Sequence, residues 1–168
     1  MQRLWAPWRE TYITTLTSKP KACVFCRILA DKKDKQHFIF IRKPHAYAVL
    51  NLYPYSNGHC LVLPNRHVGD ISKLSQEEYV ALMDLLRETK DLLQKVFKPQ
   101  GFNVGMNLGR IAGAGIPGHV HVHIVPRWKA DHNFMPVTAD TKVISQSLSG
   151  IYKRISDAYT QRYRGTRK

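Results

Sequence analysis

Apolar and polar residues alternate most clearly in residues 118–126 of this chain. Val120, Val122 and Ile124 alternate there with three histidines, and a β-strand sends successive side chains to opposite faces. The pattern predicts a strand over residues 119–126. One aliphatic face would lie in the core, and three imidazoles would line the other face.

Four further segments have the apolar, β-branched and aromatic content typical of strands, with turn residues between them. They are residues 37–42, 47–52, 59–64 and 102–107. A capping box that begins at Ser75 predicts a long helix to about Phe97, and an apolar stripe supports it. We expect a second helix within residues 141–162, and a solvated loop over the mixed charges of residues 31–36. Strands joined by hairpins, with helices to one side, predict an α+β fold with an antiparallel sheet of about five strands.

The length of 168 residues suits a single domain with a real core. Residues 1–20 include Trp5 and Trp8, and we expect them to form an irregular arm that docks on the domain. No apolar run approaches the length of a transmembrane helix, and the N-terminus lacks the apolar centre of a signal peptide. We therefore expect a cytoplasmic protein without a membrane span.

The formal net charge is +14, because 26 Lys and Arg stand against 12 Asp and Glu. Such a balance suits anionic partners, which include nucleic acids, nucleotides and polyphosphates. Part of the charge lies in the basic tail, residues 161–168. The charge alone does not choose between these partners.

His119, His121 and His123 are the three histidines of the alternating segment. Imidazoles with an ordinary pKa of about 6.5 can bind metal, attack phosphorus or carry protons. A glycine-rich stretch, residues 105–118, comes directly before them, and its backbone amides could approach an anion closely. One catalytic metal held by all three rings is disfavoured, because same-face residues on a strand stand about 6 to 7 Å apart in succession.

Three cysteines do not suggest a disulfide framework. Cys23 and Cys26 have the C-x-x-C spacing of half a structural zinc site, although a packed or redox-active pair is an alternative. Cys60 lies in an alternating apolar segment, so we expect it to be a buried strand residue.

Residues 119–125, His-Val-His-Val-His-Ile-Val, resemble the signature of the histidine triad (HIT) superfamily. Asn51 with residues 57–67 resembles the nucleoside-side strand of that family, and residues 102–107 with the glycine-rich stretch resemble its phosphate-side segment. The resemblance extends over about residues 22–137. It implies one HIT domain over residues 1–168, in which residues 138–168 form the C-terminal helix and basic tail.

Two further segments are similar to the bacterial branch of the family that acts on diadenosine polyphosphates. They are residues 4–9 and residues 126–136. The resemblance therefore implies a nucleotide-cleaving enzyme, either a hydrolase or a phosphorylase of dinucleoside polyphosphates. A nucleoside phosphoramidate hydrolase of the same superfamily is an alternative.

The resemblance also assigns roles to four histidines. His121 would attack the α-phosphorus and form a nucleotidyl-histidine, and the backbone carbonyl of His119 would fix its tautomer. His123 would donate hydrogen bonds to phosphate oxygens. His59 is the fourth histidine that the family brings alongside.

Substrate contacts follow from the same resemblance. Asn51 would meet the ribose hydroxyls, and Asn107 with the amides of the glycine-rich stretch would hold the charge that develops on phosphorus. Ile116 and Trp128 are further expected contacts. Gly115 stands where the family's diadenosine triphosphate hydrolases carry a glutamine that assists the leaving group and the entering water. This departure leaves both water and inorganic phosphate open as the acceptor.

In zinc-bearing members of the family, two histidines complete the metal site. The resemblance therefore implies one structural zinc ion per chain, bound by Cys23, Cys26, His67 and His119. It also implies a homodimer built across the long helix and the last strand. A zinc-containing nucleic-acid-binding module is a competing hypothesis, but the chain has no RNP, helix-turn-helix or finger spacing.

Overall fold

The structure is a computed structural model that describes residues 22–129, 131 and 143–164. The predicted arm over residues 1–20 lies outside the described residues, as do residues 130 and 132–136 of the segment that resembles the bacterial branch of the family. The elements in chain order are α2 (Val24–Asp31), α3 (Asp34–His37), β1 (Ile39–Arg42), β2 (Ala46–Leu50), β3 (Cys60–Pro64), η1 (Ile71–Lys73), α4 (Gln76–Phe97), β4 (Gly101–Met106), β5 (Val122–Arg127) and α6 (Leu148–Arg164).

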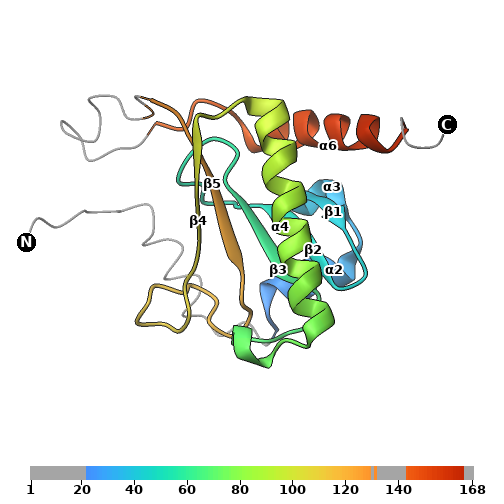
Figure 1. The fold of residues 1–168 in the computed structure, drawn as a ribbon, viewed down its shortest axis with the longest axis vertical. Helices are drawn as coiled ribbons and strands as arrows, with labels where there is room; N and C mark the ends of the chain where they lie inside the picture. Colours follow the sequence, from blue (N-terminus) through green and yellow to red (C-terminus); the bar gives the residue numbers. More distant parts are fainter. Residues whose placement is uncertain (1–21, 130, 132–142, 165–168) are drawn as a thin grey trace, which may run out of the picture.

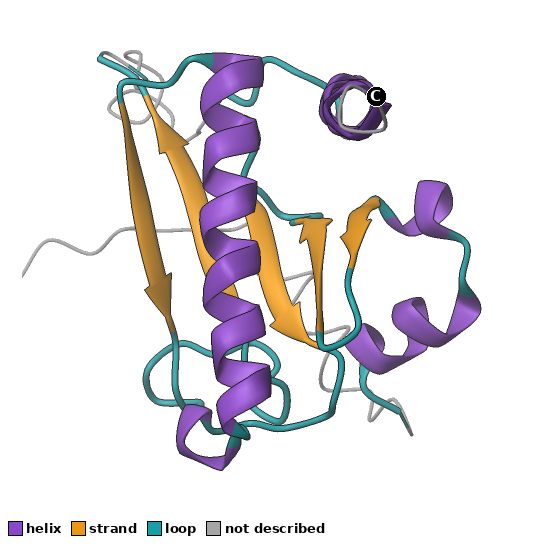
Figure 2. Ribbon diagram, turned by 45° about the vertical axis from the view of Figure 1, so that its right-hand side comes forward, coloured by secondary structure: helices purple, strands orange, loops and turns teal. Residues whose placement is uncertain are grey.

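The described strands form one five-stranded sheet in the order β1-β2-β3-β5-β4, and every neighbouring pair is antiparallel. The long helix α4 crosses one face of this sheet, and α6 lies near one end of α4 (Figures 1 and 2). The predicted α+β fold with an antiparallel sheet of about five strands is therefore confirmed. In the described part of the chain, none of the helices combines the length and apolar character that a membrane crossing requires.

Two apolar clusters lie on the two faces of the sheet. Because successive residues of β3 point to opposite faces, Cys60 and Val62 join one cluster while Leu61 and Leu63 join the other. The first cluster includes the apolar stripe of α4 and residues of α6. Cys60 is fully buried there, as the sequence predicted. The second, smaller cluster comprises Phe25, Ile39, Tyr47, Val49, Leu61 and Leu63.

The predicted capping box at the start of α4 is present. The Ser75 hydroxyl accepts the amide of Glu78 at 3.2 Å, and a Glu78 carboxylate oxygen accepts the amide of Ser75 at 2.9 Å. The guanidinium of Arg66 donates to both carboxylate oxygens of Glu78 at 2.7 Å. The first turn of α4 is thus tied to the segment that follows β3.

The prediction of a solvated loop over residues 31–36 was wrong, because α2 ends at Asp31 and α3 occupies Asp34–His37. The guanidinium of Arg42 donates to the Asp34 carboxylate and to the carbonyl of Leu29, so a strand residue fixes both short helices. Lys32 takes a left-handed conformation with φ 54° between them. This tertiary contact is invisible in the local charge pattern.

The expected start of the histidine strand was also inaccurate. β5 begins at Val122 rather than at His119, because the amide of Val120 donates to the carbonyl of Val68, outside the strand pairing, at 2.7 Å. The predicted second helix is α6, which begins at Leu148 inside the predicted segment, and the Ser147 hydroxyl accepts the amide of Gly150 near its start at 3.2 Å.

Candidate active site

The histidines gather where β3 and β5 lie side by side. Leu61 of β3 is paired with His123 of β5, so His59, just before β3, comes close to His123. His121 directly precedes β5 and is 7% exposed. The topology therefore brings His59, His121 and His123 together from two segments that are distant in the sequence.

His121 has its ring orientation set by a backbone group. Its Nδ1 lies 2.8 Å from the carbonyl oxygen of His119. Since a carbonyl can only accept, Nδ1 carries the proton, and Nε2 of a neutral His121 ring holds a lone pair. Burial lowers the pKa of His121, although the bond to the His119 carbonyl acts in the opposite direction. The neutral ring is the form that can act as a nucleophile.

His59 and His123 form a second arrangement in which a backbone group fixes the tautomers. The amide of Tyr55 donates to Nδ1 of His59 at 3.0 Å, so this nitrogen is an acceptor. Nε2 of a neutral His59 must then carry the proton, and it donates to Nδ1 of His123 at 2.9 Å. A neutral His123 consequently carries its own proton on Nε2. The ring centroids of His121 and His123 are 5.0 Å apart. The lone pair on Nε2 of His121 and the N–H group on Nε2 of His123 therefore belong to neighbouring rings.

Asn51 lies beside the buried His59. Its side-chain nitrogen is 3.3 Å from Nδ1 of His59, and its side-chain oxygen accepts the amide of Tyr53 at 3.0 Å. The structure thus places Asn51 next to the histidines, half-buried at the end of β2. A half-buried amide at this point can reach both the site and solvent.

The glycine-rich stretch connects β4 to the histidine segment. The side-chain nitrogen of Asn107 lies 3.5 Å from the carbonyl oxygen of Gly113, which is the far limit of a hydrogen bond. Gly115 and Ile116 are half-buried, and Ile116 packs against the second apolar cluster. The carbonyl of Ile116 accepts the amide of His119 at 3.3 Å. These contacts join the loop to the histidines at its C-terminal end.

Trp128 is a predicted substrate-binding residue that lies apart from the other predicted residues of the site. It is half-buried and follows the other end of β5 from His121. A strand rises about 3.3 Å per residue, so the seven residues from His121 to Trp128 span about 23 Å along the chain. Trp128 therefore lies away from the three neighbouring histidines.

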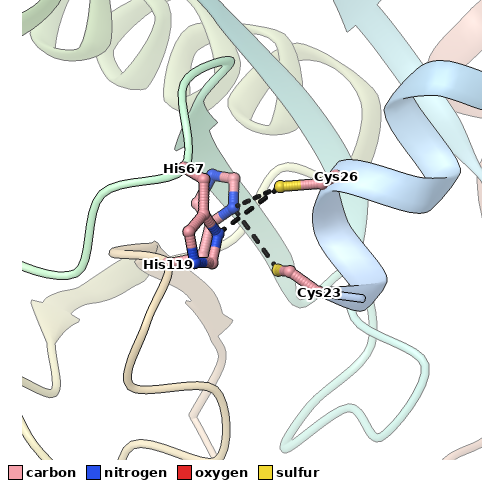
Figure 3. Close-up of side chains that lie close together, drawn as sticks. All are labelled: Cys23, Cys26, His67 and His119. Atoms are coloured by element: carbon pink, nitrogen blue, oxygen red, sulfur yellow. Dashed lines mark hydrogen bonds between the residues drawn. The ribbon is translucent and has the colours of Figure 1, made fainter. Parts of the chain in front are cut away.

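The ring of His119 belongs to a different group of side chains. His119 is fully buried, and its Nδ1 lies 3.6 Å from Sγ of Cys23 and 3.5 Å from Sγ of Cys26. Nδ1 of His67 lies 3.4 Å from Sγ of Cys26. Figure 3 shows the two cysteines at the start of α2 pointing toward both imidazoles. One potential ligand atom from each of the four residues lies within 4.8 Å of the others.

The distances in this cluster match a tetrahedral site. A zinc ion with Zn–S of about 2.3 Å and Zn–N of about 2.0 Å sets sulfur and nitrogen about 3.5 Å apart. The other nitrogen of the His119 ring lies 2.8 Å from the carbonyl oxygen of Pro64, an outer contact typical of metal-bound histidine. A Cβ atom at Gly118 would come within 3.2 Å of the His67 ring, so glycine leaves room for that imidazole. The four residues therefore form a candidate metal site.

Burial also affects the protonation of this cluster. Burial raises the pKa of the Cys26 thiol, and the nearby Cys23 raises it further. Burial lowers the pKa of His119 as well. A bound cation would reverse this tendency for the thiol, because metal ligation deprotonates cysteine.

Sequence reasoning missed two aromatic residues of the site. The ring of Phe25 lies 5.6 Å from that of His119 and 5.2 Å from that of His121. The ring of Tyr55 lies 4.7 Å from that of His59. The available signals were weak, namely the place of Phe25 between two cysteines and that of Tyr55 in a turn four residues before His59.

Known proteins match this chain in family, sequence and fold. The HIT domain family matches residues 32–130. A protein of Mycobacterium tuberculosis named AP-4-A phosphorylase is 39% identical over 155 residues, which cover 88% of this chain and 79% of that protein. The asymmetrical bis(5'-nucleosyl)-tetraphosphatase of Schizosaccharomyces pombe is 40% identical over 93 residues, which cover 55% of this chain and 50% of that protein.

Among solved structures, a Zn-bound histidine triad family protein of Mycobacterium smegmatis has the same fold. The TM-score is 0.69 at 20% identity, and the match covers 86% of this chain and 98% of that one. Family match, identity and fold lead to one conclusion, and the chain belongs to the HIT family.

Proposed function

We propose that this protein cleaves dinucleoside polyphosphates through a nucleotidyl-histidine intermediate on His121. The observation that carries the proposal is the 2.8 Å contact between Nδ1 of His121 and the carbonyl of His119, which leaves a lone pair on Nε2 of the neutral ring. The names of the phosphorylase and tetraphosphatase relatives support this class of substrate.

In the first step, Nε2 of His121 attacks the α-phosphorus of the substrate. A phosphorus–nitrogen bond forms, and the phosphorus–oxygen bond to the remaining nucleoside polyphosphate breaks. With diadenosine tetraphosphate, AMP stays on His121 and ATP departs. One difficult displacement is thereby divided into two easier ones.

His123 and His59 stabilise the charge that develops during transfer. The tautomers derived above put an N–H on Nε2 of His123, where it can donate to a phosphate oxygen. His59 holds His123 in this tautomer. Because the Tyr55 amide sets the tautomer of His59, the His59–His123 pair needs no rearrangement when the substrate binds.

Five further residues are assigned to substrate binding. Asn51 would meet the ribose, and Asn107 with the loop at Gly115 and Ile116 would hold the phosphates. Their support is their position beside the histidines or in the loop joined to them. We assign Trp128, at the other end of β5, to the distal part of a long dinucleotide.

In the second step, we propose that inorganic phosphate takes the nucleotide from His121 and releases ADP. Gly115 carries no side chain that could position a water molecule, and the relative that matches 88% of the chain is named a phosphorylase. The relative named a tetraphosphatase favours water as the second candidate acceptor. Water would release AMP instead of ADP.

We further propose that Cys23, Cys26, His67 and His119 bind one structural zinc ion. Four protein ligands form a closed site, which supplies cross-linking and no open position for catalysis. His119 would bind the metal with its ring and orient His121 with its carbonyl. Since thiols that bind metal must stay reduced, the proposal includes a cytoplasmic location.

A homodimer is the last part of the proposal. β4 is an edge strand of the sheet, and Val104 on it is 50% exposed. An exposed edge is a template for pairing with another strand. The expected interface at the last strand was wrong, because β5 lies inside the sheet between β3 and β4 and offers no free edge. We propose instead that two copies of the edge strand β4, together with α4, form the interface across a twofold axis, and light scattering would test for the dimer.

The decisive experiment is incubation with diadenosine tetraphosphate, with and without inorganic phosphate. Phosphate-dependent formation of ADP and ATP would identify a phosphorylase, whereas AMP and ATP without phosphate would identify a hydrolase. A His121→Ala variant should lose at least about a thousandfold in rate while staying folded. No cleavage by the wild type, or an unchanged rate in the variant, would refute the mechanism.

A further inference from the structure

Phe25 lies between two members of the Cys/His cluster in the sequence and contacts a member of the active site in space. It follows Cys23 by two residues, precedes Cys26, and is 7% exposed. We propose that Phe25 is a positioning residue for the imidazole of His121, and that the Cys/His cluster holds Phe25 in place. The inference rests on the proposed role of His121 as nucleophile.

The Phe25 ring contacts the imidazoles of both His121 and His119. The centroid of Phe25 lies 5.2 Å from that of His121 with an interplanar angle of 56°, and 5.6 Å from that of His119 with an angle of 81°. Both distances fall in the range of interacting aromatic pairs, about 4.5 to 7 Å. The His121 ring therefore contacts an apolar ring as well as the ring of His123, at 5.0 Å.

A packed ring supplies what the hydrogen bond to His119 cannot. The contact between Nδ1 of His121 and the carbonyl fixes one atom of the imidazole, and the ring can still tilt about that contact. Nε2 must point along the line of the bond that breaks, and a misplacement of about 1 Å can cost about a hundredfold in rate. The Phe25 ring, packed against that of His121, restricts this tilt.

Phe25 is itself held from two directions. The Tyr47 hydroxyl on β2 donates to the carbonyl of Phe25 at 3.1 Å. Cys23 and Cys26, on either side, face the two imidazoles of the cluster. Helix α2 has eight residues, and a helix this short has little stability alone. Its first turn, and with it the Phe25 ring, depends on these anchors.

The test compares Phe25→Leu, which keeps a branched apolar group but loses the ring, with Val49→Ala. Val49 is a buried member of the same apolar cluster on β2. We expect Phe25→Leu to keep its metal content and to lose about tenfold or more in kcat, with KM within about twofold of the wild type. Val49→Ala should lose stability while keeping kcat.

A second readout needs no turnover. Imidazole nitrogen chemical shifts from NMR report the tautomer of His121, and we expect Phe25→Leu to shift or broaden these signals while those of His59 stay in place. This readout distinguishes the two hypotheses, because a wild type that cleaves no dinucleotide refutes the proposed function without altering the NMR result. If Phe25→Leu fails to fold, Phe25→Met keeps a long apolar side chain without a ring. Unchanged His121 signals and kcat, or changes equal to those in Val49→Ala, would overturn the inference.

Discussion

The two faces of the sheet are built from different kinds of interaction. The face covered by α4 and α6 is packed with aliphatic and aromatic side chains, whose burial is favourable in any orientation that fills space. The opposite face combines a smaller apolar cluster with histidine rings and thiols, and hydrogen bonds aim these groups. Changes on the first face should therefore lower stability alone, whereas changes to the histidines, the two cysteines or Phe25 on the second face should alter metal content or chemistry.

The largest effect is expected from Cys26→Ala on the second face. Removing one of four ligands should abolish tight zinc binding, and zinc at about a thousand times its dissociation constant contributes about 4 kcal/mol to the folded state. The rate should also fall, since the ring of His119 loses a neighbour that lies 3.5 Å away. Elemental analysis and urea unfolding in zinc-containing buffer would measure both changes.

Cys60→Ala is the matched control, because Cys60 is a cysteine buried on the first face. It should keep one zinc per chain and the wild-type rate. Retention of one tightly bound zinc by Cys26→Ala would contradict the assignment of the ligands.

Leu93→Ala tests the first face. Leu93 is fully buried on α4, and shortening a core leucine to alanine costs about 2 to 5 kcal/mol through lost burial and a residual cavity. Urea unfolding should show this loss, while kcat per folded molecule and zinc content stay at wild-type values. A specific fall in kcat without a loss of stability would show that the division between the faces is wrong.

The sequence predicted the first face well, because one local rule decides it. The period of the apolar residues gave α4, and the capping box at Ser75 gave its start. Alternation likewise predicted the buried positions Val120, Val122 and Ile124.

The sequence did not predict helix α2, since its place depends on contacts with β1 and β2 that are distant in the sequence.

On the second face, sequence patterns predicted residue types but not their directions. Alternation implied three equivalent imidazoles, yet the ring of His119 faces the cysteines while that of His123 meets His59. The difference arises because the chain leaves the strand pairing before Val122, where the Val120 amide bonds to Val68. The resemblance to the HIT family supplied this assignment, which period and spacing could not.

On the second face, Gly115→Gln should change which molecule accepts the nucleotide from His121. Gly109 and Gly113 hold the left-handed conformation in this loop and Gly115 does not, so its backbone accepts a side chain. A glutamine that positions water should raise the AMP-to-ADP product ratio in the presence of phosphate by about tenfold or more. Chromatography of the products would measure the ratio. Gly115→Ala is the control, and an equal rise in both variants would show that the glutamine amide has no role.

The smallest effect is expected at the start of α4, where Glu78 meets Arg66. The hydrogen bonds from Arg66 lower the pKa of Glu78 to about 2. A carboxylate with a folded-state pKa below its unfolded value of about 4.3 stabilises the fold above that value, and this contribution is lost as the pH falls toward 2. Glu78→Gln keeps a side chain that can cap but has no charge. Its stability deficit against the wild type should therefore be largest near neutral pH and shrink below about pH 4.5. Urea unfolding of both proteins at each pH isolates this difference, because protonation of the Cys/His cluster affects both proteins alike. A stability deficit that stays constant down to about pH 3 would contradict the link between Arg66 and Glu78.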